Sequence, residues 1–151
     1  MATLQDFKKD LALFVEAGLI AIKQGDEESA KKLFNAIGIV DPENTSKEIG
    51  YGLIALHKLE SRKAQKYFNE VLKKEPDNYR AKAFLGFACV ASSMEADIPD
   101  DEKVQNLEKG AVIATEILEK CDVEDTRKLA QSLLDWETEL EKKGKQPGPA
   151  E

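Results

Sequence analysis

The chain has 151 residues, of which 42% are hydrophobic and 34% charged, and its formal net charge is −7. This composition predicts a soluble globular protein and excludes a disordered chain. The acidic balance without a basic stripe argues against a nucleic-acid partner. No apolar run approaches the roughly 18 residues of a membrane span, so no membrane partner is expected either.

The chain is expected to begin with a helix rather than a signal peptide, because residues 3–6 (Thr-Leu-Gln-Asp) form a capping box. The two cysteines, Cys89 and Cys121, are far apart and lack the CxxC spacing. Neither a disulfide framework nor a zinc site is therefore indicated. Together these features predict a cytoplasmic protein.

Two segments of the first half match at one fixed offset. Each of four residues has a counterpart 34 positions later: Gly18 and Gly52, Ala30 and Ala64, Phe34 and Phe68, Pro42 and Pro76. A glycine inside a helix costs about 1 kcal/mol relative to alanine, so it indicates close helix approach. The phenylalanine lies on the same helix face as the alanine four residues before it, and the proline ends the helix. The offset predicts a repeated pair of helices.

A third unit begins in register and then departs from it. Gly86 lies 34 residues after Gly52, in a helix predicted over 81–91. The next expected alanine falls at Ile98, in the non-helical stretch 94–100. Helical periodicity resumes over 101–120, where a small-small-large stripe is expected at Gly110, Ala114 and Leu118. This register implies a 12-residue insertion near 94–106.

The last predicted helix, 124–143, has one apolar stripe, as a capping helix needs. The stripe consists of Leu129, Leu133, Trp136 and Leu140. The tail 144–151 has two prolines and two glycines, so it is expected to be disordered.

The 34-residue period, with its small, small, aromatic and proline positions, resembles the tetratricopeptide repeat (TPR). The resemblance implies an all-α fold, a right-handed superhelix of about three helix pairs with a C-terminal capping helix. The repeats would cover 11–44, 45–78 and 79–122 of a single domain, 1–143. The usual first-helix aromatic is present at Phe14, whereas Glu48 takes that place in the second repeat.

No catalytic residue, cofactor site or metal site is predicted. The single histidine, His57, has no partner that the sequence proposes, and Cys89 stands where the repeats have small core residues. Cys121 is expected at a helix end and partly exposed. The acidic cluster over 95–102 lacks the glycine and spacing of an EF-hand. We therefore expect a protein that is not an enzyme.

The TPR resemblance assigns a concave groove to the first helix of each pair. One side of each of these helices is expected to pack on its partner helix, through Ala17, Gly18 and Ala21 and their counterparts Tyr51, Gly52, Ala55, Leu85, Gly86 and Cys89. The groove side would consist of nine apolar residues, predicted to bind a partner: Val15, Leu19, Ile22, Ile49, Leu53, Leu56, Ala83, Phe87 and Val90.

Two interpretations of this apolar side compete. It is covered internally, by the start of the first helix or by the C-terminal helix, or it is an open trough for an amphipathic helix. The second is favoured, because the capping helix has only one apolar stripe. The trough does not suit a client's C-terminal carboxylate, since TPR proteins of that subtype use lysine and asparagine where this chain has aliphatic residues.

The chain also resembles the TPR-type chaperones of bacterial type III secretion. The resemblance rests on residues 25–34 followed by Val-Asp-Pro at 40–42, on Gly-Tyr-Gly-Leu at 50–53 and on the closing helix at 128–140. It implies a client that is a needle or translocator subunit, held before export, and a homodimer or a pairing with a small co-chaperone. The alternative is a scaffold or assembly subunit whose groove binds a permanent partner or a second copy.

Overall fold

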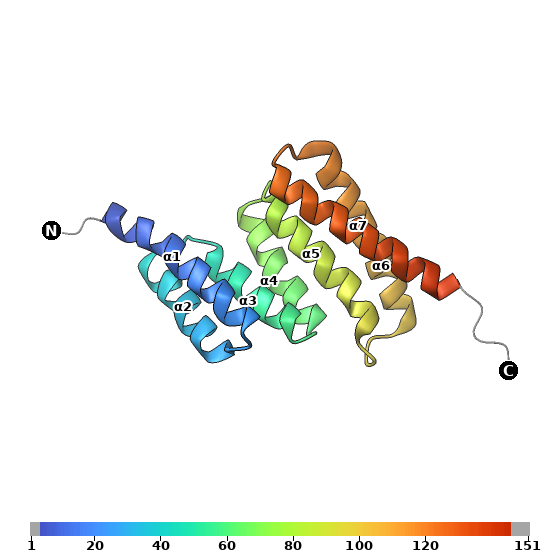
Figure 1. The fold of residues 1–151 in the computed structure, drawn as a ribbon, viewed down its shortest axis with the longest axis horizontal. Coiled ribbons are helices and arrows are strands. Elements are labelled where there is room, and N and C mark those ends of the chain that lie inside the picture. The colour runs from blue at the N-terminus through green and yellow to red at the C-terminus, as the bar shows by residue number, and fades with distance from the viewer. Residues whose placement is uncertain (1–3, 146–151) are drawn as a thin grey trace. The chain divides into compact units, whose positions relative to one another are not determined.

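The computed structural model describes the backbone of residues 4–145 and the side chains of residues 9–144. Seven α-helices occupy this range: α1 Leu4–Lys23, α2 Glu27–Val40, α3 Ser46–His57, α4 Ser61–Lys74, α5 Tyr79–Ala91, α6 Asp100–Lys120 and α7 Glu124–Lys145, with a 3-10 turn, η1, at Ser92–Met94 (Figure 1). The predicted all-α class is confirmed. Helices that follow one another pack in pairs, which is compatible with a helical repeat. None of the described helices is long and apolar enough to cross a membrane.

The chain divides into two compact units, Met1–Asp77 and Asn78–Glu151, which we call unit 1 and unit 2. Their boundary lies within one residue of the expected boundary between the second and third repeats. The single domain 1–143 stays a prediction. Helix α7 continues two residues past its expected end, to Lys145. The remainder of the expected tail, 146–151, and Thr3 of the expected capping box lie outside the described residues.

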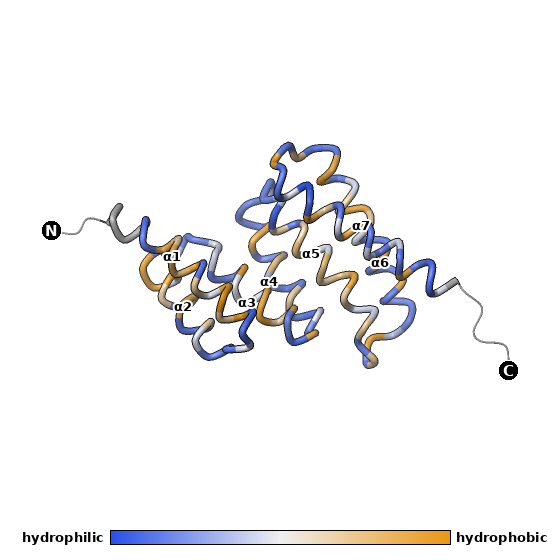
Figure 2. The backbone as a smooth tube through the Cα atoms, viewed as in Figure 1, coloured by the Kyte–Doolittle hydropathy of each residue, from blue (hydrophilic) through white to orange (hydrophobic). Residues whose placement is uncertain are grey.

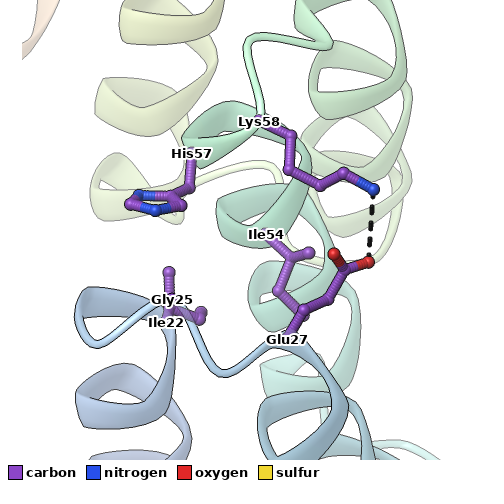
Figure 3. Close-up of a pocket in the computed structure, with 6 residues that line it drawn as sticks. All are labelled: Ile22, Gly25, Glu27, Ile54, His57 and Lys58. Carbon is purple, nitrogen blue, oxygen red and sulfur yellow. Dashed lines mark hydrogen bonds and ion pairs between the residues drawn. The ribbon is translucent and has the colours of Figure 1, made fainter.

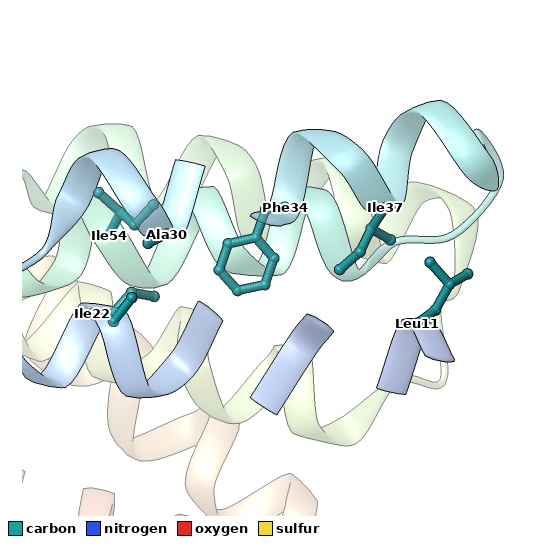
Figure 4. Packing of buried hydrophobic residues seen from close by; sticks show 7 residues of the cluster. Leu11, Ile22, Ala30, Phe34, Ile37 and Ile54 are labelled. Atoms are coloured by element: carbon teal, nitrogen blue, oxygen red, sulfur yellow. The ribbon is translucent and has the colours of Figure 1, made fainter. Parts of the chain in front are cut away.

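In unit 1, apolar residues recur along each helix between hydrophilic ones (Figure 2). The ring of Phe34 projects from α2 toward α1 and is only 1% exposed (Figure 4). A Cβ atom at Gly18 of α1 would lie 2.7 Å from Cζ of this ring, and one at Gly50 of α3 would lie 2.3 Å from its Cγ. Gly52 has the same relation to Phe68, with Cε1 at 2.5 Å. The predicted close approach is confirmed, and Gly50 adds a contact that the sequence did not single out.

The 34-residue period extends to the backbone hydrogen bonds of the turns. After α1, the Gly25 N–H donates to the carbonyl of Ile22 and the Asp26 N–H to that of Ala21, at 3.0 and 2.8 Å. After α3, the same two bonds recur 34 positions later, from 59 to 56 and from 60 to 55, at 3.0 and 2.9 Å. Both turns use a left-handed residue, Gly25 with φ 76° and Leu59 with φ 57°. The turns of the two helix pairs of unit 1 thus share their hydrogen bonds and backbone conformation, which is compatible with a helical repeat.

Unit 2 departs from this pattern where the sequence predicted a departure. Helix α5 passes into η1, and α6 begins at Asp100, one residue before its expected start. Gly86 lies under the side chain of Leu133 from α7, because a Cβ atom there would be 2.3 Å from Cδ2. The predicted stripe on α6 needs one correction. Gly110 and Ala114 are buried as expected, but Ile117 is the buried large residue of the stripe, whereas Leu118, the expected one, is only half-buried.

Replacing Gly50 by alanine should destabilise unit 1 by about 1–2 kcal/mol. The added methyl group would overlap the Phe34 ring, and overpacking of about 1–3 kcal/mol exceeds the gain of about 1 kcal/mol in helix propensity. Urea unfolding followed by circular dichroism measures the change. The matched control is Gly144→Ala, where no atom lies within 4 Å of the new Cβ. Equal stability of the Gly50 variant and the wild type would contradict the packing described.

Replacing Leu59 by glycine should instead stabilise the protein, by about 0.5–1 kcal/mol. A left-handed conformation costs an L-residue about 1–2 kcal/mol, and this exceeds the entropy that glycine loses on folding. The reverse experiment at the equivalent turn, Gly25→Ala, should destabilise by about 1 kcal/mol. Thermal unfolding of both variants reports the two opposite shifts, and shifts of the same sign would refute the role of φ.

Candidate protein-binding surface

Six of the nine predicted groove residues belong to unit 1. We call them the α1/α3 face: Val15, Leu19, Ile22, Ile49, Leu53 and Leu56. Ile22 is 9% exposed and belongs to the core cluster, and the other five are half-buried. Val15, Leu19 and Leu53 pack directly against that cluster. The face is therefore the partly exposed margin of the core and not a layer of isolated surface side chains.

The other three predicted groove residues lie on α5 and are packed within unit 2. Ala83 and Val90 have no exposed surface. The ring of Phe87 stacks on Trp136 of α7, with centroids 6.1 Å apart. Val90 also lies against α6, since a Cβ atom at Gly110 would be 2.6 Å from its Cγ2. In unit 2, Phe87 is thus packed against the C-terminal helix and Val90 against α6, and partner binding by these three residues stays a prediction.

The side expected to pack against the second helices needs one correction. Gly18, Ala21 and most of their counterparts are buried, but Ala17 is exposed. It lies between Leu13 and Ile20, which are 62% and 54% exposed and follow one another at helical spacing. These three residues form an apolar stripe on the outer side of α1. The sequence did not reveal it, because its spacing is also that of a core face.

A pocket lies at the carboxyl end of the α1/α3 face (Figure 3). Its volume is about 140 Å³, and its lining consists of Ile22, Gly25, Glu27, Ile54, His57 and Lys58. Ile22 and Ile54 are the apolar members, 9% and 6% exposed. The sequence predicted only Ile22 as a surface contact. The other five come from α2, from α3 and from the turns that follow α1 and α3, so no single periodicity could reveal the pocket.

The charged groups at this pocket are paired with each other. Glu27 accepts hydrogen bonds from Lys31 at 2.7 Å and from Lys58 at 3.3 Å, and Lys58 also lies 3.4 Å from Glu60. The bonds from Lys31 and then Lys58 lower the pKa of the Glu27 carboxyl. The bonds to Glu27 and then Glu60 raise the pKa of the Lys58 amine. Water screens these exposed pairs, so they orient side chains more than they stabilise the fold.

Both cysteines are buried. Cys121 was expected to be partly exposed, but only 6% of its surface is exposed. The Arg127 guanidinium of α7 donates to the carbonyls of Leu118 and Cys121 and so covers this end of α6. Burial raises the pKa of the Cys89 thiol to about 11. A thiol protonated at neutral pH is a poor nucleophile. Among the side chains that the structure describes, no three His, Cys, Asp or Glu groups are placed to hold a metal ion.

A comparison with protein families, curated proteins and solved structures finds no match to this chain. Any functional assignment therefore rests on the residues and contacts described above.

Both thiols should react slowly with a disulfide reagent such as DTNB while the protein is folded. Cys89 has no exposed surface and a raised pKa, and Cys121 is also buried. The released chromophore at pH 7 should approach two equivalents per chain only after guanidinium is added. Rapid release of one equivalent from the folded protein would show that one of these sites opens readily.

Proposed function

We propose that this chain is a TPR-like protein that binds an amphipathic helical segment of a client protein on its α1/α3 face. The observation that carries the proposal is the character of that face. It has five half-buried apolar side chains, and three of them, Val15, Leu19 and Leu53, pack directly against the core cluster. Burial of such partly exposed aliphatic side chains by a partner stabilises the complex, by about 25 cal/mol per Å² of apolar area removed from water.

The TPR-like assignment has structural as well as sequence support. The turn hydrogen bonds, the left-handed turn residues and the phenylalanine–glycine contacts all repeat at 34 residues within unit 1. In the proposal, the two units continue one right-handed superhelix and α7 caps its end. The α1/α3 face is then the part of the concave side that internal packing leaves accessible.

Binding would proceed by burial of the client's apolar stripe, with anchors at i, i+3 or i+4, and i+7. Ordering of the client helix offsets part of the gain. While bound, the stripe is withheld from water and from other copies of the client, which is the action of a chaperone. The sequence resemblance extends the proposal to a class of client, a needle or translocator subunit of a type III secretion system held in the cytoplasm before export.

Replacing Leu53 by aspartate should weaken client binding at least ten-fold. A carboxylate at the centre of the face would be desolvated against an apolar stripe without a compensating partner. The client is first captured from the native cytosol and identified by mass spectrometry. Its bound segment is then made as a peptide, and isothermal titration calorimetry measures its affinity for each variant.

The matched control is Leu13→Asp, the same substitution on the outer side of α1, where the side chain is 62% exposed. It should leave the affinity unchanged. Circular dichroism checks the fold, and if Leu53→Asp unfolds, Leu56→Asp replaces it on the same half-buried face. A peptide that is not an amphipathic helix, or equal affinity for the face variant and the control, would refute the proposal.

The second candidate is a scaffold or assembly subunit that self-associates or holds a permanent partner. The observation that favours it is the outer stripe of α1 together with Ile39 of α2, which is 81% exposed. Exposed apolar side chains gain from burial against a partner, as in a self-association interface. Light scattering coupled to size-exclusion chromatography separates the candidates. A stable dimer in which the α1/α3 face is covered would favour the scaffold. A monomer in which that face is accessible would favour the chaperone.

A further inference from the structure

We infer that the pocket at the carboxyl end of the α1/α3 face receives one large, neutral, apolar side chain of the bound client helix. The inference rests on the proposed function and adds to it the chemistry of one anchor residue. Ile22 is common to the face and to the pocket, so a helix lying along the face reaches the pocket without leaving it. Figure 3 shows Ile22 and Ile54 close to the Gly25 turn, with His57 beside them.

The size of the pocket fits a single side chain. Its volume is about 140 Å³. An apolar cavity of about 150 Å³ accommodates a benzene ring, so an anchor of the size of leucine, methionine or phenylalanine fills the space without rearranging its walls. Glycine or alanine at the anchor position would leave most of the pocket empty and lose the corresponding contacts.

The electrostatics of the pocket favour a neutral anchor. Glu27 already accepts hydrogen bonds from two lysines, and Lys58 lies between two carboxylates. Because these carboxylates and ammonium groups compensate one another, the pocket has no excess formal charge that would favour an incoming carboxylate or ammonium group over a neutral side chain. An aliphatic or aromatic side chain instead contacts Ile22 and Ile54 and leaves the charge network intact.

Gly25 provides a way to block the pocket with little effect on the fold. Its φ of 76° lies in the left-handed region, and a Cβ atom at this position has no atom within 4 Å. The glycine is therefore required by backbone conformation and not by crowding. Asparagine tolerates this conformation better than other non-glycine residues, so Gly25→Asn adds a polar side chain at a residue that lines the pocket with little backbone strain.

The experiment compares Gly25→Asn with Leu59→Asn, the same residue at the repeat-equivalent left-handed turn, which does not line the pocket. The probes are indole and N-acetyl-leucinamide, titrated into the full ¹⁵N-labelled chain and followed by NMR. In the wild type and in Leu59→Asn, the amide shifts should move at Gly25, Ile54 and His57. In Gly25→Asn they should not move. The client peptide should bind at least ten-fold more weakly to Gly25→Asn than to Leu59→Asn.

Thermal unfolding verifies each fold, and His57→Trp, which narrows the same pocket from its exposed rim, serves as the second blocking variant. The inference would be overturned if the probes caused no amide shift changes in the wild type. It would also be overturned if both blocking variants showed the same shift changes as the wild type. Client affinity that falls for Leu53→Asp but not for Gly25→Asn would also overturn it and would leave the proposed function standing. If Leu53→Asp left the client affinity unchanged, both the proposed function and this inference would be refuted.

Discussion

The structure of unit 1 depends on the contact between an aromatic ring and the bare backbone of its neighbouring helices. The ring of Phe34 on α2 occupies the positions where side chains of Gly18 and Gly50 would begin. One side chain thereby sets the distances from α2 to both α1 and α3. Phe68 does the same for α4 and α3 at Gly52. Because helix surfaces separate by the size of the side chains between them, a methyl group at either glycine facing Phe34 would move α1 or α3.

The α1/α3 face exists because of this close approach. With α1 and α3 both held against α2, the side chains on their shared side, among them Leu19 and Leu53, pack on the core and remain partly exposed. The pocket follows from the same arrangement, since its lining comes from the ends of α1 and α3 and the start of α2. The paired charges of Glu27 and Lys58 close one side of it without adding an unpaired charge.

Unit 2 uses equivalent positions for internal packing. Gly86 lies under Leu133 of α7, so an aliphatic side chain from a later helix takes the role that phenylalanine has in unit 1. Phe87 stacks on Trp136, and Val90 fits against Gly110. The apolar residues that continue the α1/α3 pattern along the sequence are thus used to hold α5, α6 and α7 together. The same pattern marks a partly exposed face in unit 1, whereas in unit 2 Ala83 and Val90 are fully buried and Phe87 is half-buried against Trp136.

The sequence by itself determined the helices, their pairing and the 34-residue period, because these follow from local conformation and from the glycines and phenylalanines at fixed spacing. Only the tertiary structure decided which apolar residues are covered. Ala17 was expected to be buried and is exposed, Cys121 was expected to be partly exposed and is buried, and Ile117 takes the place expected for Leu118. Periodicity fixes the direction of a side chain around its helix, but exposure depends on which other helix lies in that direction.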